Sequence, residues 1–169
     1  MMASPVGFNG RVDQIALVVR DLEAVVEQYW QRLGIGPWTI VTFGPETVRE
    51  LYFRGRPSAF RMRAAFAMTD NVQLEIIQSL DGPNIYEEFL SAHGEGMHHL
   101  GICVPDVRRA AAEMEARGHV VVQAGYGTGT SGEGGFAYFE MDAALGTIVE
   151  FIELPRQRTA TATTYPPEA

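Results

Sequence analysis

The sequence is poor in three features, and each shortage narrows what the protein can be. It holds one cysteine, Cys103, so it forms no internal disulfide, which suits a reducing compartment such as the cytoplasm. Its formal net charge of -8 disfavours nucleic acid or an anionic membrane as partner, because both bind basic faces. No apolar run approaches the ~20 residues of a membrane span, and the first residues lack a secretion-signal pattern. We therefore expect a cytoplasmic protein that binds neither nucleic acid nor membrane.

An internal repeat organises what is present. Segments 12–34 (VDQIALVVRDLEAVVEQYWQRLG) and 97–118 (MHHLGICVPDVRRAAAEMEARG) share a strand, an Asp that can cap a helix, a helical stripe and a final Gly. Further strands are predicted within IGPWTIVTF, VRELYFR, FRMRAAFAM and VQLEIIQ of the first copy and HVVVQAG, GGFAYFEMD and GTIVEFIEL of the second. The chain is 169 residues long and 46% apolar, which is enough for a core without disulfides or metal.

These elements predict an organisation of the chain. It consists of a lead-in (1–10), a first βαβββ module (11–80), a connecting helix (81–95), a second module (96–154) and a mobile tail (155–169). Because side chains alternate along a strand, four strands each have an apolar face and a second face of small or polar residues. Those second faces could line a cup.

Four polar residues occupy the second faces: Gln14, Glu75, His99 and Glu150. Glu150 stands within IVEFI and Glu75 within QLEII, where an unpaired buried carboxylate would cost several kcal/mol. Such a carboxylate is normally paired, neutralised or bound to a metal. Two carboxylates, an amide oxygen and an imidazole suit a divalent ion such as Zn, Ni, Co, Mn or Fe.

Each of these residues also has a plainer interpretation. A glutamate in an antiparallel strand can face solvent, and a histidine in an apolar strand is more often a hydrogen-bonded structural residue. We assign His98 that structural role, because alternation places it on the Leu100 side of its strand. The repeat argues against coincidence, since Gln14 matches His99 and Glu75 matches Glu150 in the two copies.

Three other features permit two interpretations each. Cys103 lies on the predicted cup face without a partner histidine, which favours a packing role over a nucleophile. The run 125–135 (GYGTGTSGEGG) lacks the ending of a P-loop and is expected to be a flexible loop, with a lid as the alternative. The four arginines between residues 54 and 63 form a solvated face or an anionic-substrate clamp.

At these residues the chain resembles the vicinal oxygen chelate superfamily, which includes glyoxalase I, methylmalonyl-CoA epimerase, extradiol dioxygenases and bleomycin-resistance proteins. The resemblance spans about residues 11 to 154 and is strongest in VQLEIIQSLDGPNIYEEFLSAHGEGMHHLGICVPD and LGTIVEFIEL. It implies an α+β fold in which two tandem βαβββ modules form a cupped mixed sheet with helices outside. It also implies one metal ligand from the first and last strand of each module, namely Gln14, Glu75, His99 and Glu150, and a homodimer.

The resemblance implies a function as well. The ligand types are similar to those of animal glyoxalase I, and the local sequence GEGMHHLG resembles epimerase-like members. We therefore expect a metal-dependent isomerase, epimerase or lyase that removes a proton next to a metal-bound carbonyl, with Glu150 nominated as the base and Glu75 as its partner. One alternative is a non-enzymatic protein that sequesters a drug or metabolite in the same cup. Another is an Fe(II) dioxygenase, which Gln14 disfavours because those enzymes use two His and one Glu.

Overall fold

The described chain forms eleven strands and three helices. The first half contains β1 (Gln14–Val18), α1 (Leu22–Leu33), β2 (Trp38–Phe43), β3 (Glu50–Phe53), β4 (Arg56–Pro57), β5 (Arg61–Met68) and β6 (Gln73–Asp81). Helix α2 (Ile85–His93) leads to β7 (Gly96–Cys103), α3 (Val107–Glu115), β8 (Val121–Thr128), β9 (Gly134–Phe139), β10 (Ile148–Glu153) and β11 (Thr163–Tyr165). The computed structural model describes residues 11–141, 145–158 and 162–167, so the predicted lead-in at 1–10 lies outside it.

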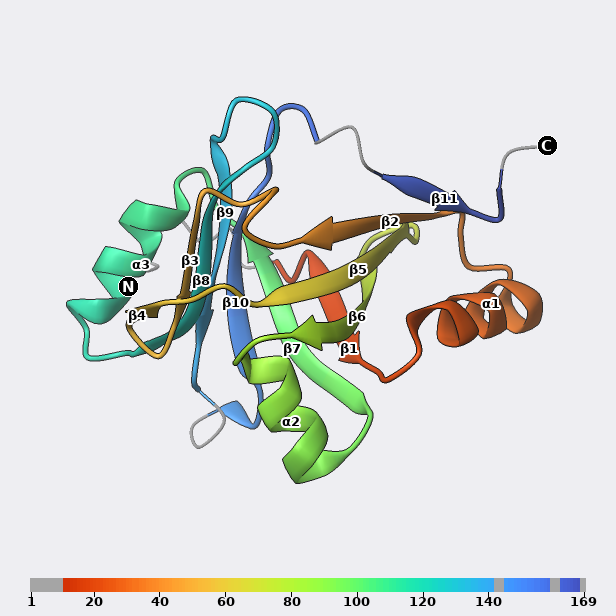
Figure 1. Cartoon of the computed structure of the whole chain (residues 1–169), viewed down its shortest axis with the longest axis horizontal. Helices are drawn as coiled ribbons and strands as arrows, with labels where there is room; N and C mark the ends of the chain where they lie inside the picture. Colours follow the sequence, from red (N-terminus) through yellow and green to blue (C-terminus); the bar gives the residue numbers. More distant parts are fainter. Residues whose placement is uncertain (1–10, 142–144, 159–161, 168–169) are drawn as a thin grey trace.

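All eleven strands belong to one curled sheet in the order β11-β2-β5-β6-β1-β7-β10-β9-β8-β3-β4 (Figure 1). The sheet is mixed, because β1 runs parallel to β6 and β7 runs parallel to β10, while the other pairs are antiparallel. The two halves meet at the antiparallel pair β1–β7 and repeat one order, β1-β6-β5-β2 and β7-β10-β9-β8, outward from this pair. The predicted α+β fold with a cupped mixed sheet is confirmed.

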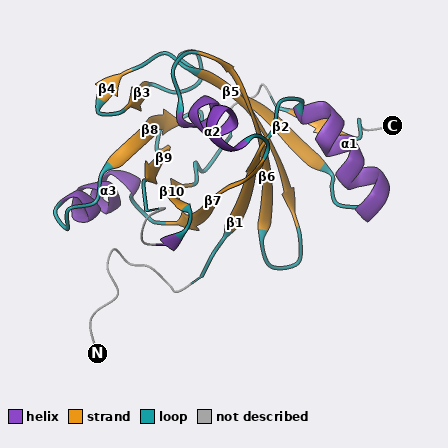
Figure 2. Ribbon diagram, turned by 90° about the horizontal axis from the view of Figure 1, so that it is seen from below, coloured by secondary structure: helices purple, strands orange, loops and turns teal. Residues whose placement is uncertain are grey.

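Helices α1 and α3 cover the convex face of the sheet, on opposite sides of the molecule (Figure 2). Leu22 and Val26 of α1 pack on Ile76 of β6, and the apolar stripe of α3 packs on β9 and β10. Each helix begins at the predicted aspartate: Asp21 accepts a hydrogen bond from the backbone N–H of Ala24, and Asp106 accepts one from that of Arg109. The sheet therefore has one face available for a site, the concave one.

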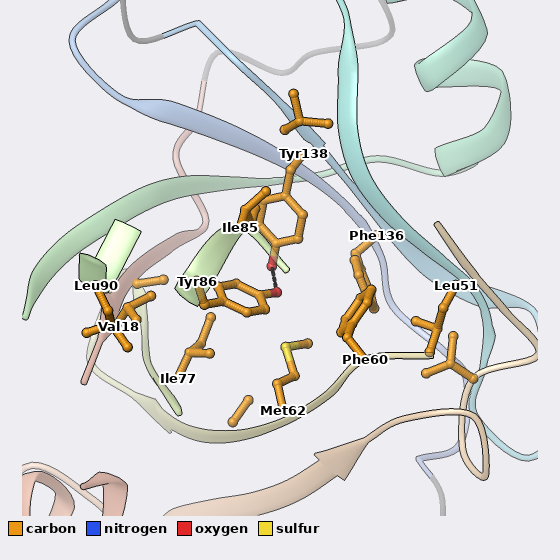
Figure 3. Close-up of a cluster of buried hydrophobic side chains, with 14 residues drawn as sticks. Val18, Leu51, Phe60, Met62, Ile77, Ile85, Tyr86, Leu90, Phe136 and Tyr138 are labelled. Atoms are coloured by element: carbon orange, nitrogen blue, oxygen red, sulfur yellow. Dashed lines mark hydrogen bonds between the residues drawn. The ribbon is translucent and has the colours of Figure 1, made fainter. Parts of the chain in front are cut away.

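Helix α2 closes one end of the cup rather than covering the convex face. Figure 2 shows it between the two walls of the curled sheet. Ile85, Tyr86 and Leu90 of this helix are buried against Val18 and Ile77 from the concave face (Figure 3). The hydroxyl of Tyr86 donates a hydrogen bond of 2.9 Å to that of Tyr138 on β9, which ties the helix to the second half. This cluster leaves the other end of the cup open.

Two pairings were not anticipated from the sequence. The β3–β4 hairpin belongs to the first half of the chain but extends the edge of the second, where β3 pairs with β8. Strand β11, within the segment predicted as a mobile tail, pairs with the edge strand β2. Both additions complete sheet edges, whose unpaired N–H and C=O groups accept any extended segment that reaches them. No helix among the described residues is long and apolar enough to cross a membrane.

Candidate metal centre

The structure brings the four predicted residues together on the concave face. Gln14, Glu75, His99 and Glu150 come from the four adjacent strands at the centre of the sheet, β1, β6, β7 and β10, and all four are buried. His99 Nε2 lies 3.1 Å from Glu150 Oε2, 3.3 Å from Glu75 Oε2 and 3.4 Å from Gln14 Oε1. These residues form what we call the four-residue cluster.

The register of the strands explains this convergence. Gln14 lies opposite Gly101 across the β1–β7 pair, and His99 lies opposite Ala16. Glu75 is the neighbour of Ala16 on the other side, and Glu150 is the neighbour of Gly101. Each half thus places a small residue beside a carboxylate, and the small residue leaves room for the ligand-type side chain of the other half.

Gly101 shows how little room there is. A Cβ atom at this position would lie 2.7 Å from Gln14 Oε1 and 2.8 Å from Gln14 Cβ, closer than such atoms approach in proteins. It would also lie 2.8 Å from Cδ1 of Ile152. Glycine is required here for space and not for its backbone freedom, since its φ is not positive.

The amide of Gln14 can serve the cluster in two orientations. With Oε1 directed to His99, its Nε2 donates a hydrogen bond of 2.9 Å to Gln73 Oε1 outside the cluster. Turned by half a rotation, the amide nitrogen donates to Glu150 Oε2 at 3.0 Å and to Glu75 Oε2 at 3.1 Å. The first orientation places three oxygens face to face and needs a cation or a shared proton between them. The second satisfies the carboxylates without a cation, provided that the amide of Gln73 turns as well.

Burial and mutual charge determine the protonation of the cluster. Burial raises the pKa of Glu75 to about 7, and the charge of Glu150 adds to this effect while His99 opposes it. Burial lowers the pKa of His99, but the charge of Glu150 and the hydrogen bonds to both carboxylates outweigh it and raise this pKa to about 9. Near neutral pH the cation-free cluster therefore holds protons that partly balance the charge of its carboxylates.

The atoms of the cluster fit a divalent cation. Ligand atoms about 2.1 Å from one ion and about 90° apart lie roughly 3.0 Å from each other. His99 Nε2 and the Gln14 oxygen position lie 3.4 Å apart, and each lies 3.0 to 3.3 Å from Oε2 of Glu75 and from Oε2 of Glu150. Glu75, His99 and Glu150 are the one group of His, Cys, Asp or Glu side chains in the described chain whose ligand atoms converge in this way.

His98 contacts the cluster from behind, contrary to the sequence prediction that places it on the Leu100 side. The β1–β7 register shifts between Ala16 and Leu17, which makes a bulge that gives β7 one extra residue at His98. His98 Nδ1 consequently lies 2.8 Å from His99 Nδ1, and its ring contacts Phe89 of α2 and Tyr138 of β9. A hydrogen bond from His99 Nδ1–H to this nitrogen would leave His99 Nε2 free to bind a cation.

A pocket adjoins the cluster on the open side of the cup. The space between its walls is about 680 Å³, and this figure includes volume that is open to solvent. Gln14, Glu75 and Glu150 line its inner end, and its walls are largely apolar. Phe43 of the first half contacts Phe136 of the second, with ring centroids 6.3 Å apart, so both halves of the repeat build the pocket.

The other candidates from the sequence lie outside the cluster. Arg54 pairs with Glu88, Arg61 with Glu46 and Asp81, and Arg63 with Glu23, so the arginines between residues 54 and 63 form a largely ion-paired surface, and none of them lines the pocket. Cys103 is half-buried outside the pocket, and burial together with the charge of Asp13 raises its thiol pKa, which disfavours a nucleophile. The glycine-rich run is mostly strand: β8 extends to Thr128 and β9 begins at Gly134.

Two features of the site have no clear signal in the sequence. The doublet of His98 and His99 is visible, but nothing in MHHL marks the bulge that places both rings side by side. Arg158, from the segment after β10, lines the pocket, although the sequence analysis assigns it to the predicted mobile tail.

Comparisons with known proteins agree with this architecture. The family model described as the Glyoxalase/Bleomycin resistance protein/Dioxygenase superfamily matches residues 13–139, well over half of the chain. The match ends before Glu150, so the fourth residue of the cluster is placed by the structure. No curated protein matches the sequence significantly.

Solved structures similar to this chain include methylmalonyl-CoA epimerases. The epimerase from Mycobacterium tuberculosis is 19% identical, with 92% of this chain and 93% of that chain covered and a TM-score of 0.60. An epimerase in complex with methylmalonyl-CoA and NH4+ is 19% identical, with 88% and 97% covered and a TM-score of 0.60. A variant of the Streptomyces coelicolor epimerase with 2-nitronate-propionyl-CoA bound is 18% identical, with 92% and 99% covered and a TM-score of 0.60. At these identities the similarity shows the fold.

Proposed function

Because the chain belongs to the glyoxalase/bleomycin resistance protein/dioxygenase superfamily, we propose that it is a metal-dependent isomerase, epimerase or lyase that moves a proton next to a carbonyl group. The observation that carries this proposal is the convergence of Gln14, Glu75, His99 and Glu150 at the inner end of a pocket with apolar walls. A protein that only needed a stable core would not bury two carboxylates beside an imidazole at the end of an open pocket.

Each residue of the cluster has a proposed role. Gln14 through Oε1, His99 through Nε2 and the two carboxylates would hold the cation. When bound there, a divalent cation supplies positive charge that polarises a carbonyl and stabilises the negative charge developing on its oxygen. His98 would keep the proton of His99 on Nδ1, so that Nε2 faces the cluster.

The proton transfer is assigned to the carboxylates, because both line the pocket. One carboxylate, when it is displaced from the ion, takes the proton from the carbon beside the carbonyl. A proton is then returned to the adjacent carbon by the same group, or to the other face by the second carboxyl group. We assign the base to Glu150 with Glu75 as its partner. The aromatic walls keep competing water away from the carbanion-like state.

The first test is metal content, measured by mass spectrometry on protein purified without a metal-affinity tag. We expect close to one divalent ion per chain in the native protein and loss of that ion in the double variant His99→Ala/Glu150→Gln. The matched control is His93→Ala/Glu88→Gln, which makes the same changes on exposed positions of α2 and should retain the ion. Protein that binds no ion, even after addition of Zn, Ni, Co or Mn, contradicts the proposal.

The second test follows the proton. Exchange of the proton beside the carbonyl is measured by NMR in D₂O, first with methylmalonyl-CoA, the ligand of one similar structure, and then with the glutathione adduct of methylglyoxal. Exchange that requires the ion and disappears in Glu150→Gln supports the proposal. Tight binding of such compounds without the ion or exchange would instead favour a sequestering protein, and oxygen uptake with catechols would favour a dioxygenase.

A further inference from the structure

The segment after β10 forms the outer wall of the pocket. Leu154, Pro155 and Arg158 all line it. Strand β10 belongs to the second half, whereas β11 pairs with β2 at the outer edge of the first half, on the other side of the cup (Figure 1). The described residues directly after β10 are therefore part of the pocket wall.

The neighbouring loop, residues 129–133, fixes this segment in place. The backbone N–H of Thr130 donates a hydrogen bond of 3.1 Å to the carbonyl of Gln157, and that of Arg156 donates one of 2.9 Å to Glu133 Oε1. Pro155 packs so closely on Gly129 that a Cβ atom there would lie 2.4 Å from Pro155 Cβ. Arg158 thus extends from a segment anchored directly before it.

Arg158 is the one cationic side chain among the described residues that line the pocket. Its guanidinium carbon lies 5.1 Å from the centre of the Phe66 ring. Phe66 is in turn directly opposite Glu75 in the β5–β6 pair, where neighbouring residues are about 5 Å apart. The guanidinium is therefore within the length of a small molecule from the four-residue cluster.

Arg158 also has no ion-pair partner in the described part of the chain, unlike Arg54, Arg61, Arg63 and Arg108, each of which pairs with a glutamate. Stacking on an aromatic ring holds the guanidinium in a defined position and leaves its N–H groups free. A ligand in the pocket would cover this exposed cation, and the covered charge then needs an anionic partner.

We propose that Arg158 binds an anionic group of the substrate, a carboxylate or a phosphate, while the reacting carbonyl lies at the four-residue cluster. This inference rests on the proposed function, because it assigns a second contact of the same substrate. The planar guanidinium would bind such a group through two parallel hydrogen bonds. The substrate class is accordingly an anionic carbonyl compound with an apolar portion against the aromatic walls.

The test compares acids with their neutral amides in protein stripped of metal, so that a carboxylate cannot gain affinity from the ion. The probes are 3-phenylpropionate and 4-phenylbutyrate with the corresponding amides, and their dissociation constants are measured by calorimetry or NMR. We expect the native protein to favour the acids by about tenfold to a hundredfold, the effect of a charge-assisted hydrogen bond, and Arg158→Gln to lose this preference. Arg158→Lys should keep part of it, since lysine retains the charge without the paired hydrogen bonds.

The matched control is Arg156→Gln. It removes the same charge at a position two residues before Arg158, from a side chain that does not line the pocket. A second arm compares propionyl-CoA with propionyl-pantetheine, which lacks the CoA phosphates. If Arg158→Gln no longer prefers the acids to the amides, the anionic group that Arg158 binds is a carboxylate. If it no longer prefers propionyl-CoA to propionyl-pantetheine, that group is a phosphate. If Arg158→Gln and Arg156→Gln agree in both arms, the proposal is wrong. Because stripped protein is used, this outcome is independent of the metal content and proton exchange that test the proposed function.

Discussion

Binding of a divalent cation to the four-residue cluster should release protons, and the amount can be derived from the structure. In the cation-free protein the pKa of His99 is about 9 and that of Glu75 about 7, because two carboxylates and an imidazole share a buried site. At pH 7 His99 then carries about one proton and Glu75 about half of one. Both must leave for the cluster to coordinate the ion.

We therefore expect the release of roughly 1.5 protons per ion at pH 7, about two below pH 6 and about one at pH 8. The affinity for the ion should therefore rise with pH. A plot of the logarithm of the association constant against pH should have a slope near two at pH 6 and near one at pH 8. The physical cause is charge balance, since the ion replaces the protons that otherwise offset the charge of the buried carboxylates.

Calorimetric titration of the stripped protein with Co²⁺ or Ni²⁺ measures this release, when repeated at one pH in buffers of different ionisation enthalpy. Glu75→Gln removes one of the titrating groups, so its release at pH 6 should fall to about one proton. The release should decline as the pH rises, because His99 also loses the charge and the hydrogen bond of Glu75 that raise its pKa. The surface variant Glu88→Gln should behave like the native protein. An ion that binds without releasing protons would refute the assignment of His99 and Glu75 as ligands.

Three further variants test the surroundings of the cluster. Gly101→Ala places a methyl group 2.7 Å from Gln14 Oε1. Urea unfolding should therefore show a free energy of unfolding lower by about 1–3 kcal/mol, and metal titration should show about tenfold weaker binding. An unchanged metal affinity would show that Gln14 is not a ligand. His98→Phe keeps the aromatic packing but removes the partner of His99 Nδ1, which should weaken metal binding about 10- to 100-fold while the chain stays folded, whereas a loss of folding alone would show that His98 only packs. Tyr138→Phe leaves the buried hydroxyl of Tyr86 without its acceptor and should lower the free energy of unfolding in urea by about 1–3 kcal/mol. The control Tyr126→Phe, at a half-buried position, should change this free energy by less than about 0.5 kcal/mol. Equal effects of the two variants would show that the hydrogen bond has no specific role.

The central part of the fold was predictable because its signals are local. Alternation along each strand correctly separated the concave residues Ala16 and Val18 from Leu17, which packs beneath α1 on the convex face. Aspartates before both outer helices marked their first turns. The internal repeat then related Gln14 to His99 and suggested a shared site, which the register of the central strands brings together.

The remaining features depend on contacts that no local pattern encodes. The bulge at His98 arises from the pairing of β7 with β1, and one extra residue there reverses the alternation that placed this side chain on the other face. The β3–β4 hairpin and β11 pair with strands far away in the sequence, because sheet edges accept segments without regard to their place in the chain. Arg158 belongs to the pocket only through such a long-range arrangement.

The asymmetry of the repeat shows how the cluster can exist with and without an ion. His99 has a fixed partner behind it, His98, and can change only its protonation. Gln14, its counterpart in the first half, can turn: its nitrogen reaches both carboxylates at 3.0 and 3.1 Å, and its oxygen would face a cation from the same position. A second histidine would present one nitrogen to the cluster and could not satisfy two carboxylates in the empty site so well. Because the empty cluster is hydrogen-bonded and the core elsewhere is apolar, folding does not require the ion. An ion bound there would then be free to serve chemistry alone, and metal-stripped protein is a suitable state in which to measure what the pocket itself binds.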